Sequence, residues 1–201
     1  MSRRTLARVA LALFAASSSA ACGGGGGGNN PPAPVAVVDQ EFDPTSVNNF
    51  SSCDTGYCPA QTFTVGITGT LTGFDLYIRR IAMAGSVTVD LRATNAGVPL
   101  TDDANFYEAF TFDASVLPAS TQFVHFELTA PIQVIAGEVL AITIRDTVFG
   151  SGQLVGWDGN AFPGPYAGGA QFGRAGAYTE PYVVEFTGNG DLGFRTYVIP
   201  D

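Results

Sequence analysis

Several segments of the chain alternate apolar and polar residues with a period of two, the pattern of a β-strand with one buried face. The alternating segments are residues 73–80, 86–93, 123–128 and 138–146, with shorter ones at 108–112, 182–186 and 194–199. Glycine- and proline-rich turns separate them, and no helical period follows the first 21 residues. We therefore expect an all-β fold: a jelly-roll-like β-sandwich, with an immunoglobulin-like sandwich as the alternative.

The same alternation predicts which side chains point into the core and which point away from it. The expected inward residues are Phe74, Leu76, Ile78, Val87, Val89, Leu91, Val124, Phe126, Leu128, Leu140, Ile142 and Ile144. The expected outward residues are Asp75, Tyr77, Arg79, Thr88, Asp90, Arg92, His125, Glu127, Ala141, Thr143 and Arg145. One polar face per strand predicts two sheets that pack on the inside and are solvated on the outside.

The first 21 residues have the three zones of a secretory signal peptide. Arg3, Arg4 and Arg8 form a basic start, residues 9–16 are continuously apolar, and residues 17–21 are small. The apolar run is shorter than the roughly 20 residues that cross a bilayer as a helix. No later stretch reaches that length, so we expect an exported chain that does not span a membrane.

Residues 20–22 (AAC) resemble the lipobox of bacterial lipoproteins, with Ser19 where leucine is usual. The resemblance implies cleavage before Cys22 and acylation of that cysteine, which anchors the protein in a lipid bilayer because several acyl chains hold firmly. An ordinary cleavage site with an incidental cysteine is the alternative. In enterobacterial lipoproteins, an aspartate directly after the acylated cysteine signals retention in the inner membrane. Gly23 stands at this position, so the chain resembles lipoproteins of the outer membrane. This predicts the outer membrane of a Gram-negative bacterium, with the side that the domain faces left open.

Residues 22–34 contain six consecutive glycines, two asparagines and a proline-rich end, a composition expected to form a flexible linker. A glycine-rich chain of this length spans on the order of 20 Å. A phosphate-binding glycine loop is excluded because such loops need a lysine, which the chain lacks. The remaining residues, 35–201, are expected to form a single sandwich domain.

The numbers of cysteines and of charged residues restrict which covalent links, metal sites and partners are expected. If Cys22 is acylated, Cys53 and Cys58 remain, and the four residues between them allow a small disulfide loop worth about 2 kcal/mol. A zinc site is the alternative, but two cysteines and the single His125 make a poor ligand set.

Without the signal peptide, the chain has six basic and 18 acidic residues, which gives a net charge of −12. A nucleic-acid partner is therefore not expected.

Residues 147–180 show little strand pattern, and a structureless loop of this length is often functional. Sugar-binding sandwiches use exposed rings as platforms with a few polar groups around them. The candidate ligand-binding residues are Trp157, Asp158, Asn160, Phe162, Tyr166 and Gln171. The alternative is that these rings fold back and close one end of the sandwich.

Metal binding and catalysis have weaker candidates. Asp39, Glu41 and Asp191 would supply oxygen ligands to a structural calcium ion, although no spaced calcium-loop motif is present. A glycoside hydrolase would need two carboxylates on one cleft, and Glu127 is expected to face solvent beside His125. No nucleophile-elbow motif accompanies the single histidine. We therefore assign no catalytic residue and expect His125 to be an ordinary surface residue.

The segments AQTFTVGITGTLTGFDLYIRR, PIQVIAGEVLAITI, PYAGG and DLGFRTYV resemble a β-sandwich module that is common in exported, surface-anchored bacterial proteins. The resemblance runs over residues 39–198 and implies a jelly-roll-like fold at a cell surface, with no settled catalytic residues. We expect a non-catalytic surface lipoprotein that binds an extracellular ligand, foremost a glycan. The alternatives are a structural or protein-assembly module of the cell envelope and a glycan hydrolase.

Overall fold

A computed structural model describes residues 33–44, 49–52, 57–82, 85–101, 106–146, 154–160, 166–175, 181–184 and 190–201. The predicted signal peptide, Cys22, most of the linker, Cys53 and Phe162 lie outside these ranges. Cys58 is buried at the start of a strand, and its pairing with Cys53 stays a prediction. No helix of the described residues is both long and apolar enough to cross a membrane.

The described chain is almost entirely β-strand. The strands are β1 (Val37–Phe42), β2 (Asn49–Ser52), β3 (Tyr57–Thr64), β4 (Gly69–Arg80), β5 (Ser86–Asn95), β6 (Val98–Pro99), β7 (Phe106–Asp113), β8 (Gln122–Val134), β9 (Val139–Asp146), β10 (Val155–Asn160), β11 (Gln171–Ala175), β12 (Val183–Val184), β13 (Asp191–Leu192) and β14 (Phe194–Pro200). One turn of 3-10 helix, Ala114–Val116, lies between β7 and β8. The prediction of an all-β fold is confirmed.

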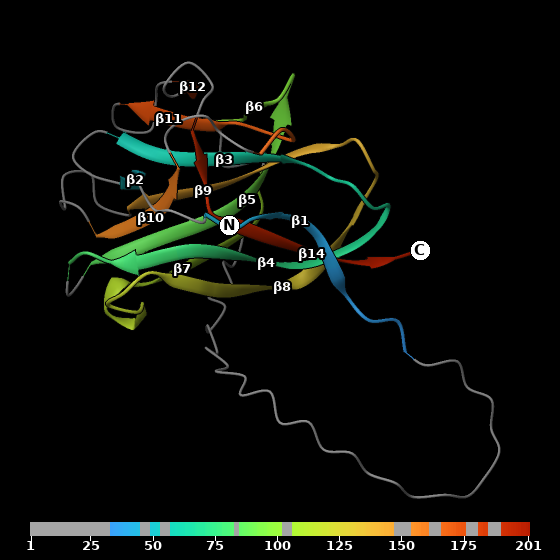
Figure 1. The fold of residues 1–201 in the computed structure, drawn as a ribbon, viewed down its shortest axis with the longest axis horizontal. Helices are drawn as coiled ribbons and strands as arrows, with labels where there is room; N and C mark the ends of the chain where they lie inside the picture. Colours follow the sequence, from blue (N-terminus) through green and yellow to red (C-terminus); the bar gives the residue numbers. More distant parts are fainter. Residues whose placement is uncertain are drawn as a thin grey trace, which may run out of the picture.

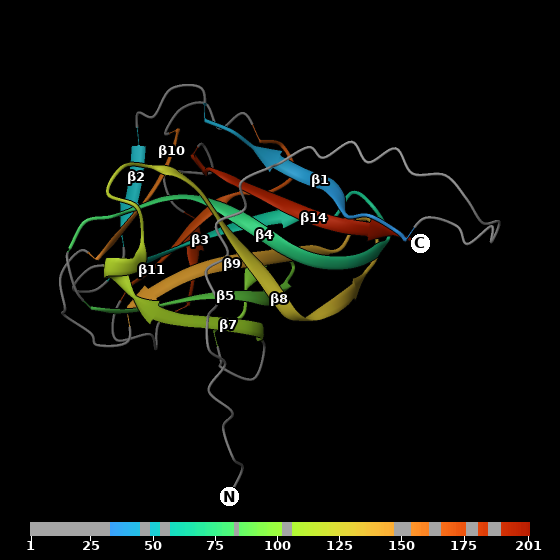
Figure 2. The same cartoon turned by 90° about the horizontal axis from the view of Figure 1, so that it is seen from below.

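The strands form two antiparallel sheets that pack face to face (Figure 1, Figure 2). Sheet 1 contains β1-β14-β4-β8, and sheet 2 contains β3-β9-β5-β7. In Figure 2, β1, β14 and β4 lie above β9, β5 and β7. Successive strands mostly alternate between the sheets, and the two orders are those of a jelly roll. The jelly-roll prediction therefore holds in preference to the immunoglobulin-like alternative.

The core between the sheets consists of the side chains that the alternation placed inward. Of the predicted set, all but the partly buried Val124 are at most 7% exposed. On β4, for example, Phe74, Leu76 and Ile78 are fully buried. Phe74 stacks on Phe126 of β8 at 5.4 Å between ring centres. The period of two therefore located the apolar faces of the main strands correctly.

The prediction that residues 147–180 lack strands is wrong. Strand β10 pairs with β4 and β2 at one end of sheet 1, and β11 extends sheet 2 beyond β3. The sequence of β10, VGWDGN, is buried on both faces over its first five residues, so it shows no polar–apolar alternation. Gly159 is required there, because a Cβ atom would lie 2.0 Å from the carbonyl oxygen of Asp191.

The prediction that sheet 2 is solvated on its outer face is also wrong. Thr88, Asp90, Arg92, Ala141 and Thr143 do point away from the core, yet all of them are buried. Arg145, beside them, keeps only 23% of its side chain exposed. The polar side chains satisfy one another instead of being hydrated, which a strand pattern alone cannot distinguish from a solvated face.

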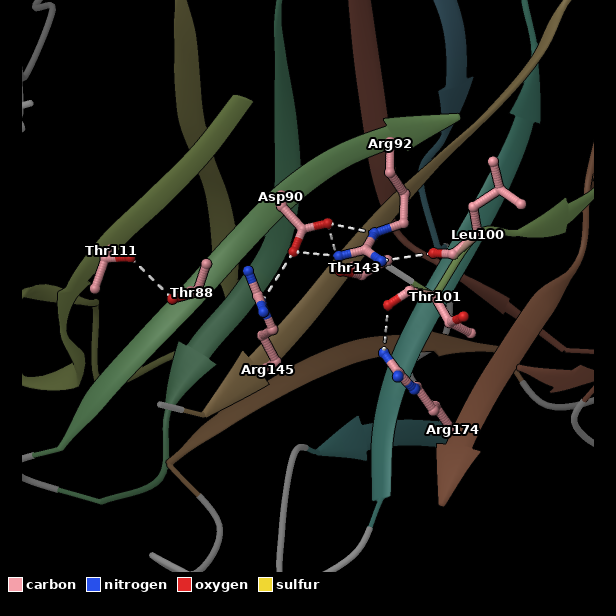
Figure 3. Close-up of polar contacts among 9 residues, drawn as sticks. All are labelled: Thr88, Asp90, Arg92, Leu100, Thr101, Thr111, Thr143, Arg145 and Arg174. Carbon is pink, nitrogen blue, oxygen red and sulfur yellow. Dashed lines mark hydrogen bonds and ion pairs between the residues drawn. The ribbon is translucent and has the colours of Figure 1, made fainter. Parts of the chain in front are cut away.

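Asp90 is the centre of this buried polar cluster (Figure 3). Its carboxylate accepts hydrogen bonds from Nε and Nη2 of Arg92 at 2.6 and 2.8 Å, and from Oγ1 of Thr143 at 2.8 Å. Arg145 completes the set with an ion pair of 3.2 Å. The geometry is the two-pronged arrangement in which guanidinium and carboxylate bind most strongly.

Tyr182 covers the cluster from outside. Its ring lies 6.0 Å from the guanidinium of Arg92 and 5.5 Å from that of Arg174. The two arginines are also held to the segment after β6, because Arg92 donates to the Leu100 carbonyl and Arg174 to the Thr101 carbonyl. This part of sheet 2 is therefore closed, whereas Tyr107 on β7 of the same sheet is exposed.

Replacing Asp90 with alanine should destabilise the protein by about 3–5 kcal/mol, because it leaves buried guanidinium groups without their carboxylate. Glu41→Ala is the matched control, because it removes a carboxylate from an exposed pair with Arg195 and should cost less than about 1 kcal/mol. Urea unfolding at neutral pH measures both. Equal, small losses for the two variants would show that the Asp90 cluster does not hold sheet 2 together.

Candidate functional site

Trp157 belongs to the core and is not an exposed sugar platform. It is 0% exposed, and its Nε1 donates to the Gly193 carbonyl at 2.8 Å. The register of β10 pairs Trp157 with the inward-facing Ile78, so the ring points between the sheets. The prediction of Trp157 as a ligand-binding residue is wrong for this reason, and the alternative of a packing role is correct.

Asp158 and Asn160 lie on the opposite face of β10 from Trp157. Asp158 is only 3% exposed and forms an ion pair of 3.2 Å with Arg79, while Thr121 donates to the same oxygen, Oδ2. Its Oδ1 is buried without a hydrogen-bond partner among the described residues. Asn160 is half-buried at the end of the strand. Asp158 therefore ties β10 to β4 and is closed to a large ligand.

Tyr166 and Gln171 are also held by the protein. The Tyr166 hydroxyl donates to Oε1 of Gln40 at 2.9 Å, and its ring meets Phe194 edge-on at 5.1 Å. Burial raises the pKa of Tyr166 to about 12. Gln171 is buried in β11. The described members of the predicted set therefore do not form an exposed platform, and Phe162 lies outside the described residues.

The calcium candidates are not gathered into one site. Asp39 accepts the Gly66 amide, Glu41 pairs with Arg195 at 2.5 Å, and Asp191 accepts from Gln61 at 3.2 Å. Burial raises the pKa of the Asp191 carboxyl, which disfavours its charged form. Among the described residues, no group of three histidine, cysteine or acidic side chains could hold a metal ion. The geometry of the described residues gives the calcium hypothesis no support.

The outer face of sheet 1 carries a polar and aromatic surface that residues 147–180 do not supply. One row crosses all four main strands, because each residue pairs with the next in the antiparallel registers. That row runs Glu41, Arg195, Asp75 and His125. Glu41, Arg195 and Asp75 alternate in sign, and His125 continues the alternation when its ring is protonated. Neighbours in such a row lie close enough to interact.

A second row places two aromatic rings beside the charged one. Tyr77 of β4 pairs with Phe123 of β8, and the ring centres are 4.9 Å apart. The guanidinium of Arg195 lies 3.8 Å from the centre of the Phe123 ring, a cation–π contact. Both rings are half-buried, so they combine accessible apolar surface with a fixed orientation.

A third row lies on the other side of the charged row. Tyr197 of β14 and Glu127 of β8 flank Gly73, which has no side chain to fill the space between them. The His125 ring uses this space, because a Cβ atom on Gly73 would lie 3.1 Å from its Cε1. Tyr197 meets the same ring edge-on at 5.5 Å.

Asp75 connects the charged row to the third row. Its Oδ1 lies 2.6 Å from Nδ1 of His125, and its Oδ2 accepts the Tyr197 hydroxyl at 2.5 Å. Burial and the hydrogen bond to Asp75 raise the pKa of Tyr197, so this hydroxyl stays protonated at physiological pH. The three side chains form one hydrogen-bonded unit on three neighbouring strands.

No protein-family model matches the chain, and no curated protein matches it. The candidate site is therefore defined by the geometry of this chain alone. Sequence reasoning had placed Tyr77 and His125 outward, but it did not select Phe123, Tyr197 or Arg195. The signal that would have found them is register: only the pairing of β14 and β8 with β4 shows that these residues share one face.

Replacing Trp157 with alanine should destabilise the domain by about 3–5 kcal/mol, the loss typical of a large buried aromatic side chain. The gap left between β10 and the core and the lost hydrogen bond to the Gly193 carbonyl both contribute, although that carbonyl still accepts the Tyr77 amide at 2.9 Å. Chemical denaturation measures the loss. A variant with unchanged stability would show that Trp157 does not pack as described.

Proposed function

We propose that the protein is a non-catalytic, lipid-anchored envelope protein whose outer face of sheet 1 binds an extracellular saccharide. One observation carries the proposal: half-buried rings and hydrogen-bonding side chains share a solvated sheet face, in rows fixed by strand pairing. The rings are Tyr77, Phe123, His125 and Tyr197, and the polar groups are Glu41, Asp75, Glu127 and Arg195. Apolar ring surface with nearby hydrogen-bonding groups is suited to a sugar.

The charges of this face favour a neutral saccharide at neutral and alkaline pH. Glu41, Asp75 and Glu127 lie on it, and Asp43 pairs with Arg195 from the end of β1 at 3.0 Å. Arg195 is therefore neutralised by its two carboxylate partners, Glu41 and Asp43. The whole chain carries a net charge of −9, so a polyanionic ligand would be repelled at long range as well.

The anchor is proposed from the sequence. Acylation of Cys22 would attach the chain to the bilayer, most simply the outer membrane of a Gram-negative bacterium, and the glycine-rich linker would keep the domain clear of the headgroups. The Cys53–Cys58 disulfide belongs to the same proposal, because an exported domain folds where disulfides persist. It would fasten the short connection between β2 and β3, which belong to different sheets.

Phe123→Ala and Tyr77→Ala should each weaken saccharide binding about tenfold, because each removes a ring that would contact the sugar. The chain from residue 22 onward, carrying Cys22→Ser for solubility, is screened on an array of neutral and acidic glycans. Affinities for the best ligand are then measured by calorimetry.

Tyr107→Ala is the matched control, because Tyr107 is 44% exposed on β7 of the opposite sheet. Its loss should leave saccharide affinity unchanged. Thermal unfolding of each variant must show a folded domain. If the array gives no signal with any glycan, the saccharide function is rejected, and capture of an envelope protein by the same chain would favour an assembly role instead.

The anchor makes a separate prediction. The native protein extracted from membranes should have Cys22 as its first residue and an intact mass that exceeds the polypeptide mass by several acyl chains. It should partition into detergent, and Cys22→Ser should release it into the aqueous phase. An unmodified Cys22 on a freely soluble chain would contradict the anchor and leave the sheet face as the surviving proposal.

A further inference from the structure

The His125 imidazole is held on one side and open on the other. Its Nδ1 lies 2.6 Å from Oδ1 of Asp75, while the side chain is 52% exposed. No hydrogen bond joins its Nε2 to any residue that the structure describes. The ring extends over Gly73 and against Tyr197, so its position is fixed although half of it faces solvent.

The partner on Nδ1 determines what the exposed nitrogen can do. Asp75 as a carboxylate accepts hydrogen bonds and cannot donate one, and its second oxygen is already bonded to the Tyr197 hydroxyl. In the neutral ring the proton therefore sits on Nδ1, and Nε2 presents a lone pair. In the protonated ring, Nε2 presents an N–H group and the ring carries a positive charge.

The groups around the ring favour its protonated form. Asp75 faces it from β4, Tyr197 and Arg195 lie on β14, and Glu127 is on its own strand. The hydrogen bond to Asp75 raises the pKa of His125 above its ordinary value, partial burial opposes this, and the charges of Asp75 and Glu127 add to it. Asp75 is thus the positioning residue, and His125 is the group that would touch a ligand.

We propose that His125 makes the ligand selectivity of this face depend on pH, so that a carboxylate-bearing saccharide binds only when the ring is protonated. This rests on the proposed saccharide function. Above the transition, the lone pair of Nε2 and the neighbouring carboxylates repel a uronate group. Below it, the same nitrogen donates a charge-assisted hydrogen bond. A neutral sugar hydroxyl can accept or donate, so its binding changes little with pH.

The proton switch itself can be measured without a ligand. His125 is the single histidine of the chain, so every imidazole signal in an NMR titration belongs to it. The wild type should show the Nδ1–H tautomer when neutral and a midpoint above about 6.5. Asp75→Asn should lower the midpoint, because the amide keeps the shape but removes the charge. An Nε2–H tautomer, or an unchanged midpoint in Asp75→Asn, would overturn the inference.

The selectivity is tested with hexagalacturonate and cellohexaose on the same Cys22→Ser chain, at about pH 5.5 and about pH 8.5. The carboxylates of hexagalacturonate are ionised at both values. Wild type should bind it at least about tenfold more tightly in acid, while its affinity for cellohexaose changes less than about threefold. His125→Gln, which cannot titrate, should lose the pH dependence for hexagalacturonate.

The outcomes separate the two proposals. Equal affinity for hexagalacturonate at both pH values, or a pH dependence that survives in His125→Gln, overturns the switch and leaves the saccharide function standing. Binding of neither oligosaccharide at either pH, together with a silent glycan array, overturns the saccharide function and the selectivity with it.

Discussion

The pairing of β4 along both of its edges is the constraint on which the rest of the molecule depends. Residues 69–76 of β4 pair with β14, residues 69–78 pair with β8, and residues 78–80 pair with β10. These partners come from distant parts of the sequence, so a large loop-closure entropy must be overcome before any of the contacts stabilise the fold. Once these strands have paired with β4, Asp75 necessarily lies between Arg195 and His125. The candidate face is thus assembled as a consequence of the topology.

The outer faces of the two sheets differ in how far their charged side chains are exposed to solvent. On sheet 2, the carboxylate of Asp90 is enclosed by arginines and covered by Tyr182, so the charges are buried and mutually satisfied. Burying such a cluster costs desolvation that its ion pairs roughly offset, whereas removing one partner leaves an uncompensated buried charge. On sheet 1, Glu41 and His125 keep 43% and 52% of their side chains exposed, while Asp75 between β14 and β8 is buried. Exposed groups of this kind can exchange water for a ligand, which supports the proposal of a binding face on sheet 1.

Sequence periodicity predicted the fold and the core but only part of the candidate site. The alternation found Phe74, Leu76 and Ile78 because β4 has one apolar and one polar face. It failed for β10, where both faces are buried, and so it left Trp157 in an apparent loop. It also could not distinguish the closed outer face at Asp90 from the more exposed one at His125. That difference arises from the placement of Tyr182, which is 92 residues away in sequence from Asp90 and follows from tertiary packing alone.

The proton on His125 has unequal consequences for folding and for recognition. Because its pKa is raised in the folded state, the pair with Asp75 contributes stability fully below the unfolded value of 6.5, and this stability is lost as pH rises through the folded pKa. The ring is half exposed, so solvent screening keeps that contribution small. The charge at the surface nevertheless changes by one full unit, on a face where Arg195 is already neutralised by two carboxylates. A half-exposed histidine with a fixed tautomer can therefore alter ligand selectivity while the fold that presents it stays almost equally stable.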